Sequence, residues 1–108
     1  MSNAGQTAAQ VIRRVLSQHR VRVEQILLFG SRARGQAGPS SDWDFYVLID
    51  GDLSFAERQH LVTEIKRELA RLRIPNDVIL KSAQQYHRTK SLPGHLAYDV
   101  AHEGIPLP

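Results

Sequence analysis

The stretch that decides the fold reads GSRARG at residues 30–35 and SDWDFYVLI at residues 41–49. The first part is a glycine-serine turn, and the second brings two carboxylates, Asp42 and Asp44, to the start of an apolar strand. Successive side chains of a strand point to opposite faces, so these carboxylates share a face and lie about 7 Å apart along the chain. The residues that alternate with them, from Trp43 to Ile49, are apolar. We therefore expect the strand to bury one face and to present two negative charges from the other.

Two carboxylates this close together repel, and without a cation the pKa of at least one of them should rise. A divalent cation removes that conflict, and Mg²⁺ takes oxygen ligands from one or two carboxylates together with substrate phosphates and water. The alternative is that Asp42 only turns the chain as it enters the strand. Because the pair follows a Gly-Ser turn, we favour metal binding by Asp42 and Asp44.

The turn has the features of a phosphate site. It follows the apolar run ILLF at residues 26–29, which is typical of a buried strand. Gly30 lets the backbone approach a ligand without a side chain in the way. Ser31 can cap a short helix through Arg34, and a helix start offers free N–H groups to a phosphate. We therefore expect phosphate binding at this turn.

The turn also opens like a P-loop but does not continue like one. Gln36 and Ala37 stand where lysine and serine or threonine would be required, which disfavours a Walker-type ATPase. Arg32 and Arg34 can contact phosphate or form a solvated basic surface, and the sequence leaves both interpretations open.

Together these residues resemble the DNA polymerase beta-type nucleotidyltransferase superfamily, and within it the small prokaryotic minimal nucleotidyltransferases, the MNT group. The pattern GSRARG followed by SD-x-D is matched almost letter for letter, and the resemblance covers roughly residues 10–105. It implies an α/β fold of the α+β kind, like the palm of polymerase beta, with a small mixed β-sheet and helices packed mainly on one face. It also implies that Gly30 and Ser31 hold a nucleoside triphosphate, while Asp42 and Asp44 hold magnesium ions.

The family needs a third carboxylate on a neighbouring strand. By resemblance, Asp77 at the head of the apolar run 77–80 completes the metal-binding set and accepts the proton of the attacking hydroxyl. Acids that flank a glycine after a strand are expected in turns, and acids on the last helix are more simply solvated. The rivals that we weigh less for these reasons are Asp50, Asp52, Asp99 and Glu103.

The resemblance implies nucleotidyl transfer, in which an acceptor hydroxyl attacks the α-phosphorus of a nucleoside triphosphate and pyrophosphate leaves. Two Mg²⁺ ions, which Mn²⁺ can replace, would clamp the attacking and leaving oxygens. MNT proteins are often paired with an all-helical HEPN protein as a toxin–antitoxin couple, and the resemblance implies transfer of AMP from ATP to a tyrosine of the toxin. Two other interpretations stay open: a binding module that neutralises its partner by contact alone, and a small-molecule nucleotidyltransferase acting as a homodimer.

The length and composition agree with one small domain. A chain of 108 residues has the usual size of a single domain. We assign residues 5–108 to it and interpret Met1–Ala4 as the remnant of an expression tag. No segment approaches the roughly 18 apolar residues that a membrane span needs, and the start lacks a secretory signal pattern. Cysteine is absent, so disulfides are excluded. We expect a cytoplasmic protein, since nucleoside triphosphates and magnesium are found there.

The charge and the aromatic residues do not favour specific binding of nucleic acid. The net charge is +3, and most basic residues from Arg58 to Arg73 alternate with glutamates on one expected helix, which is typical of a solvated face. The few aromatic residues do not alternate with basic ones in a stacking stripe. We interpret all five histidines as surface or packing residues: His19, His60, His87, His95 and His102.

The rest of the sequence predicts the scaffold. Apolar residues at helical spacing predict a helix over 7–19. The capping box Ser54-x-x-Glu57 predicts a second helix, which should end before Pro75. Short helices are expected at about 82–90 and 93–103, and a flexible loop at 36–41.

Overall fold

The computed structural model describes residues 4–108, so most of the expected tag remnant lies outside the described residues. The four helices are α1 (Ala4–Gln18), α2 (Phe55–Arg71), α3 (Ala83–Thr89) and α4 (Leu96–Glu103). The four strands are β1 (Val23–Phe29), β2 (Trp43–Ile49), β3 (Asn76–Ser82) and β4 (Ile105–Leu107). Each long helix and each long strand is present where the sequence predicts it.

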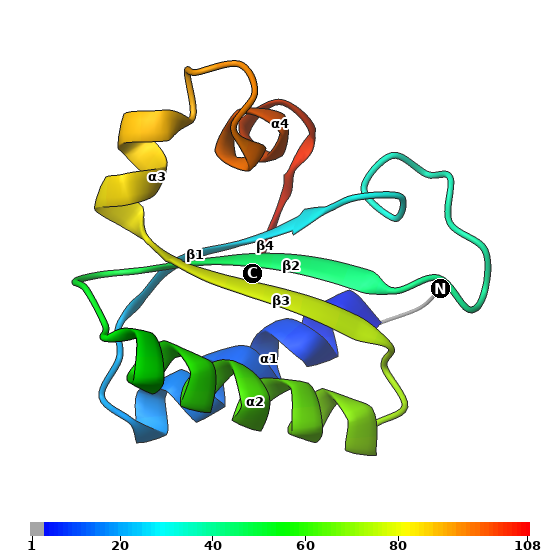
Figure 1. Cartoon of the computed structure of the whole chain (residues 1–108). Coiled ribbons are helices and arrows are strands. Elements are labelled where there is room, and N and C mark those ends of the chain that lie inside the picture. The colour runs from blue at the N-terminus through cyan, green and yellow to red at the C-terminus, as the bar shows by residue number, and fades with distance from the viewer. Residues whose placement is uncertain (1–3) are drawn as a thin grey trace.

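The strands form one mixed sheet in the order β3-β2-β1-β4 (Figure 1). β1 pairs antiparallel with both β2 and β4, whereas β2 pairs parallel with β3. Parallel neighbours need a crossover connection, and α2 supplies it between β2 and β3. As a result, the start of β2, the start of β3 and the end of β1 meet at the same edge of the sheet, beside the loop that joins β1 to β2 (Figure 1).

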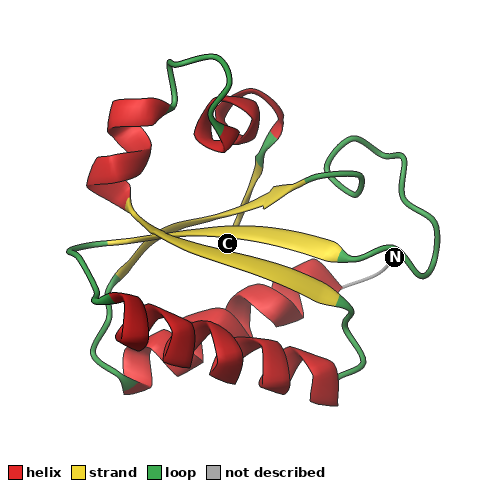
Figure 2. Ribbon diagram, viewed as in Figure 1, coloured by secondary structure: helices red, strands yellow, loops and turns green. Residues whose placement is uncertain are grey.

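The helices lie in two layers. The long helices α1 and α2 cover one face, and the short helices α3 and α4 lie over the other (Figure 2). Alternate strand residues belong to the two cores: Phe45 and Val47 pack with α1 and α2, while Tyr46 and Leu48 pack with α3 and α4. The expectation of a mixed sheet with helices mainly on one face is therefore confirmed for the two long helices.

The strands are buried on both faces over most of their length, which explains why β1 and β2 read as continuous apolar runs. As expected, β2 buries the face of Phe45, Val47 and Ile49 and presents Asp42 and Asp44, neither of them buried, from the other. On the face that carries these two aspartates, the side chains from Tyr46 onward pack under α3 and α4.

Two helix predictions need correction. Residues 31–35 form a turn, not a short helix: the N–H of Arg34 donates to the Gly30 carbonyl at 3.2 Å, and that of Gln36 donates to the Ser31 carbonyl at 2.9 Å. Successive bonds of different span cannot continue as an α-helix. The helix α2 ends at Arg71, so Arg73 lies outside it, with a backbone φ of 59°.

The C-terminal strand β4 escaped the sequence analysis. It is three residues long and contains a proline, and such a segment carries little period-two signal. β4 pairs with Ile26–Leu28 of β1 and so forms the outer strand of the sheet on the side opposite β3. Within residues 4–108, no helix is long and apolar enough to cross a membrane.

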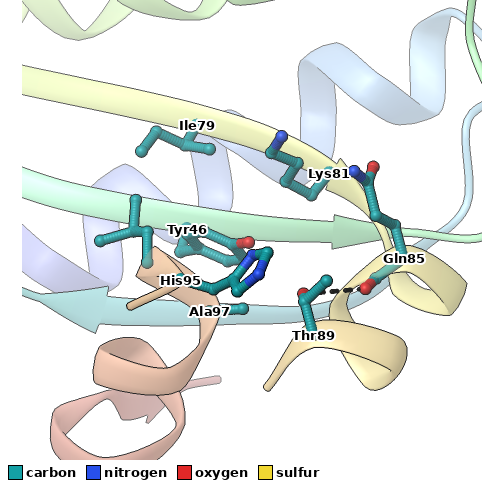
Figure 3. A pocket seen from close by; sticks show the side chains of 8 residues that line it. Tyr46, Ile79, Lys81, Gln85, Thr89, His95 and Ala97 are labelled. Atoms are coloured by element: carbon teal, nitrogen blue, oxygen red, sulfur yellow. Dashed lines mark hydrogen bonds between the residues drawn. The ribbon is translucent and has the colours of Figure 1, made fainter. Parts of the chain in front are cut away.

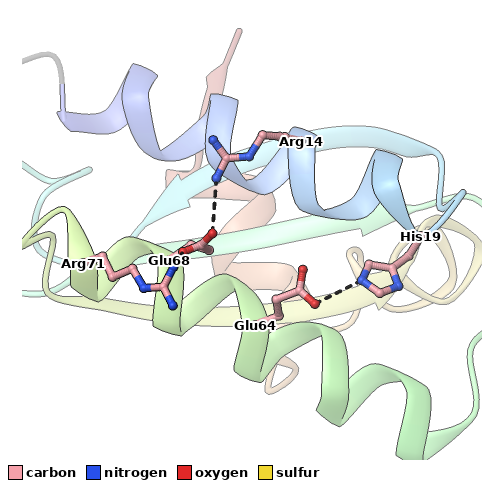
Figure 4. A network of polar contacts seen from close by, with 5 residues as sticks. All are labelled: Arg14, His19, Glu64, Glu68 and Arg71. Atoms are coloured by element: carbon pink, nitrogen blue, oxygen red, sulfur yellow. Dashed lines mark hydrogen bonds and ion pairs between the residues drawn. The ribbon is translucent and has the colours of Figure 1, made fainter.

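Surface ion pairs join the two long helices (Figure 4). Glu68 of α2 pairs with Arg14 of α1 at 3.6 Å and with Arg71 at 2.9 Å, while Glu64 pairs with His19 at 3.1 Å. Exposed pairs of this kind contribute little each, so the apolar contact between the helices and the sheet carries most of the stability.

The capping box of α2 forms as predicted. The Ser54 hydroxyl accepts from the N–H of Glu57 at 3.1 Å, and the Glu57 carboxylate accepts from the N–H of Ser54 at 3.0 Å. These hydrogen bonds lower the pKa of Glu57. Phe55 and Leu72 stand at the two ends of this helix and are 72% and 50% exposed.

We expect Ser54→Ala to lower the free energy of unfolding by about 1 kcal/mol, because α2 loses its N-cap. Urea titration followed by circular dichroism measures this change. The control is Ser91→Ala, an exposed serine in the turn between α3 and α4. Equal stability of the two variants would contradict a stabilising role for the capping box.

Candidate active site

The predicted acidic residues meet at one edge of the sheet. Asp44 pairs in register with Phe29 of β1 and with Asp77 of β3. Residues in register on neighbouring strands project from the same face, so the carboxylates of Asp44 and Asp77 are neighbours. Asp42 stands two residues earlier on the same face and is exposed. The parallel pairing of β2 and β3 therefore brings together three carboxylates from sequence positions up to 35 apart.

The environment of Asp44 is electrostatically unfavourable for a carboxylate. Partial burial, the charge of Asp77 and the charge of Asp42 raise its pKa, and only Arg34 opposes them. Gly30, with a backbone φ of 76°, lies directly against this side chain: a Cβ atom at Gly30 would overlap Oδ2 of Asp44. Glycine is thus required here both by the left-handed backbone and by the close approach of the carboxylate.

Asp77 carries a counter-ion that the sequence analysis missed. Its Oδ1 atom lies 3.5 Å from Nζ of Lys66 on α2, and its side chain is 56% exposed. No local pattern marks Lys66, since it is one of several basic residues on the exposed part of α2. The ion pair exists only because the β2-α2-β3 crossover returns the chain beside its own helix.

The donor set suits Mg²⁺ chemically, because all three side chains offer hard carboxylate oxygens. The raised pKa of Asp44 shows a repulsion that a divalent cation would relieve. The carboxylates do not yet converge, however: within residues 4–108, no group of three acidic, histidine or cysteine side chains is arranged to hold one ion. Metal binding by Asp42, Asp44 and Asp77 therefore stays a prediction.

The two arginines of the turn have different environments. Nη1 of Arg34 lies 3.1 Å from Oε2 of Glu103 at the end of α4, and its Nε donates to Oε1 of Gln36 at 3.2 Å. Arg34 also lowers the pKa of Asp44, so its charge acts on the acidic edge. The sequence analysis treated Glu103 as a solvated acid, whereas in the structure it is a counter-ion of the turn.

Arg32 is engaged with the loop instead. Its guanidinium donates to the Ser41 carbonyl from Nε at 3.1 Å and from Nη2 at 2.8 Å, and it lies 4.3 Å from the centre of the Trp43 ring. Trp43 packs against the α1–α2 core, on the opposite face from Asp44. Arg32 thus ties the 36–41 loop to the sheet, and its contact with phosphate stays a prediction.

The remaining rivals for the third carboxylate are placed by the topology. Asp50 follows the far end of β2, about 20 Å along the strand from Asp44, and Asp52 comes after it. Asp99 lies on α4 and, with Glu103, lines a cavity beside Gly30 and Arg34.

None of the five histidines is buried. Two of them pair with glutamates, His19 with Glu64 and His87 with Glu24.

Two cavities flank the acidic edge on the face of the sheet that α3 and α4 cover. The first, which we name the turn cavity, has a volume of about 340 Å³ and lies between the Gly30–Arg34 turn and α4. The second, which we name the α3–α4 cavity, has a volume of about 420 Å³ (Figure 3). Its lining comes from β2, β3, α3 and α4 and includes Tyr46, Ile79, Lys81, Gln85, Thr89 and His95.

Comparison with known proteins agrees with this arrangement. Residues 10–107 match the family model described as polymerase beta, nucleotidyltransferase. That match covers nearly the whole chain. No curated protein matches the chain.

Solved structures with a similar fold come from toxin–antitoxin complexes. One, a toxin–antitoxin with AMP-PNP, has a TM-score of 0.57 and 22% identity over 92% of this chain and 71% of that chain. A second, a mutant of the toxin–antitoxin MntA-HpeT, has a TM-score of 0.60 and 21% identity over 94% and 72%. A third holds the tri-AMPylated HEPN toxin of Shewanella oneidensis with its MNT antitoxin, with a TM-score of 0.58 and 21% identity over 96% and 71%. At these identities the likeness shows a shared fold.

We expect Asp44→Asn to raise the thermal midpoint of the metal-free protein at pH 7. The folded environment raises the pKa of Asp44 above its ordinary value of 3.8, so the ionised carboxylate destabilises the fold at neutral pH. Asparagine removes that cost. The difference between the variants should shrink as the pH falls through the raised pKa of the folded state and should vanish only below the ordinary value of 3.8, where Asp44 is protonated in both the folded and the unfolded state. Differential scanning fluorimetry across this pH range measures it.

Added Mg²⁺ should then raise the midpoint of the unmodified protein more than that of Asp44→Asn, because an ion that binds only the folded state stabilises it. Asp52→Asn is the matched control, since Asp52 lies beyond the far end of β2. An equal response to Mg²⁺ in all three proteins would contradict a metal site at Asp44.

Proposed function

The chain belongs to the polymerase beta nucleotidyltransferase family, and from that premise we propose that it transfers AMP from ATP to a hydroxyl group of a protein partner. The observation that carries this proposal is the pairing of Asp44 with Asp77 beside the Gly30–Ser31 turn. Carboxylates in that position suit a metal-assisted phosphoryl transfer, because they offer ligands next to a turn that can receive phosphates.

Asp42, Asp44 and Asp77 would hold two Mg²⁺ ions, or Mn²⁺ in their place. When bound, these ions would offset the negative charge that develops on the attacking and leaving oxygens. The carboxylates bring the ligands to one edge of the sheet. Because Gly30 has no side chain, it leaves free the space that the carboxylate of Asp44 occupies.

The other residues of the edge position the reactants. Gly30 and Ser31 receive the β- and γ-phosphates at the turn, and Arg34 adds a positive charge on the same side. The acceptor oxygen forms a bond to the α-phosphorus while the bond from that phosphorus to pyrophosphate breaks. Asp77 takes the proton that the acceptor hydroxyl loses; its Oδ1 atom lies 3.5 Å from Nζ of Lys66, and the side chain is exposed.

We assign the acceptor to a tyrosine of a HEPN-type helical protein, so that the chain would act as the antitoxin of a toxin–antitoxin pair. The shared fold with MNT antitoxins, one of them in complex with an AMPylated HEPN toxin, supports this assignment. Such a pair would work in the cytoplasm, where ATP and Mg²⁺ are available.

The expected reaction is the addition of AMP to a HEPN-type protein partner, in the presence of ATP and Mg²⁺. Asp42→Asn and Asp44→Asn should each lower the transfer rate at least about 100-fold, because each loses a metal ligand that supports several kcal/mol of transition-state stabilisation. Mass spectrometry of both proteins measures the transfer. Asp52→Asn, beyond the far end of β2, is the control and should leave the rate unchanged.

The same variants separate the proposal from its alternatives. Full transfer by Asp44→Asn would sink the proposed mechanism. A tight complex with the partner, unaffected by Asp42→Asn and without AMP transfer by the unmodified protein, would favour a non-catalytic binding module. Transfer to a small molecule by a dimer of the chain would favour the homodimeric enzyme.

A further inference from the structure

The α3–α4 cavity begins where the acidic edge ends. Tyr46 follows Asp44 by two residues on β2, and Ile79 follows Asp77 by two residues on β3, so the cavity floor continues the same face of the sheet. Two residues along a strand span about 7 Å. A ligand whose α-phosphate lies at the carboxylates therefore needs only a group the size of a ribose to reach the cavity.

The lining combines flat apolar surface with a polar rim that contains no carboxylate among the described residues. Tyr46 and Ile79 form the floor, and Leu96 and Ala97 of α4 add apolar wall. Tyr46 is held in place by the neighbouring rings of Phe29 and Tyr86, with centroids 6.1 and 5.7 Å away. Because burial raises the pKa of Tyr46, its hydroxyl stays neutral and can donate or accept a hydrogen bond.

The rim residues can read the edge of a heteroaromatic ring. The Gln85 amide offers a donor and an acceptor, while Thr89 and His95 come from the two helices that bound the cavity (Figure 3). His95 is the N-cap residue of α4, yet its side chain makes no capping hydrogen bond. Its ring is therefore available to a ligand.

The two cavities differ in charge. Two carboxylates, Asp99 and Glu103, line the turn cavity together with Arg34, which already pairs with Glu103. Among the described residues, no carboxylate lines the α3–α4 cavity, and Lys81 is its charged member. An anionic nucleotide whose terminal phosphates lie at the turn would thus extend across β2 toward β3, away from the acids of α4.

We propose that the α3–α4 cavity binds the nucleoside part of the nucleotide, a flat base with its ribose, through Tyr46, Gln85 and His95. This site rests on the proposed function, since it assumes that the phosphates lie at the turn and the acidic edge. It assigns recognition of the base to α3 and α4, so these short helices are the part of the fold that selects the nucleotide.

The test compares two ligands that share the phosphates but not the nucleoside. Calorimetry measures the binding of AMP-PNP with Mg²⁺ and of tripolyphosphate with Mg²⁺ to the unmodified chain, to Gln85→Ala and to His95→Ala. Each variant should weaken AMP-PNP by about three- to tenfold, the effect of one lost hydrogen bond, and should leave tripolyphosphate unchanged. The matched control is Gln84→Ala, an exposed neighbour on α3 outside the cavity lining, which should bind both ligands normally.

Each other outcome has a definite meaning. Unchanged AMP-PNP binding in both variants, or equal weakening of both ligands, would overturn the nucleoside site while leaving the proposed function standing. Failure of the unmodified chain to bind tripolyphosphate would overturn the phosphate site and the proposed function instead. In that case the α3–α4 cavity is tested with adenosine, which has no phosphates. Changes in the NMR chemical shifts of Gln85 and His95 on addition of adenosine would support the nucleoside site, and unchanged shifts would overturn it.

Discussion

The structure depends above all on the parallel, in-register pairing of β2 with β3. This pairing sets Asp44 beside Asp77. Burial, followed by repulsion from Asp77 and Asp42, raises the pKa of Asp44. Two carboxylates on adjacent strands are costly in a protein without a cation, and the fold keeps them at an exposed edge where an ion or a lysine can reach them. The crossover helix that makes the pairing possible also supplies the lysine, Lys66.

The rest of the fold keeps this edge open. Both faces of β1, β2 and β3 are covered by helices further along the strands, so the sheet behaves as a rigid support. Gly30 leaves the space that the Asp44 carboxylate occupies, and Arg32 ties the adjoining loop to Trp43. Such a support fixes the backbone positions of the carboxylates, so their convergence on an ion needs only side-chain rotation.

The short C-terminal helices give the second layer its role. They complete the core over Tyr46 and Leu48. α4 also lines both cavities that flank the acidic edge, whereas α3 lines only the α3–α4 cavity. Leu96, at the first turn of α4, lines both cavities and so separates them. Glu103 at the other end of α4 holds Arg34. The position of a single helix therefore affects the turn and the cavity at once.

The sequence by itself determined the elements whose signals are local. The GSRARG turn, the SDWD strand start and the Ser54–Glu57 capping box depend on residue type and spacing over a few positions, and they lie where they were expected. Tertiary structure alone decided that Lys66 pairs with Asp77, that Arg32 and Arg34 have different partners, that α3 and α4 bury the second face, and that β4 adds a strand to the sheet. These features depend on strand register and on contacts between distant segments, whose free energies come from packing and charge in three dimensions and leave no periodic trace in the chain.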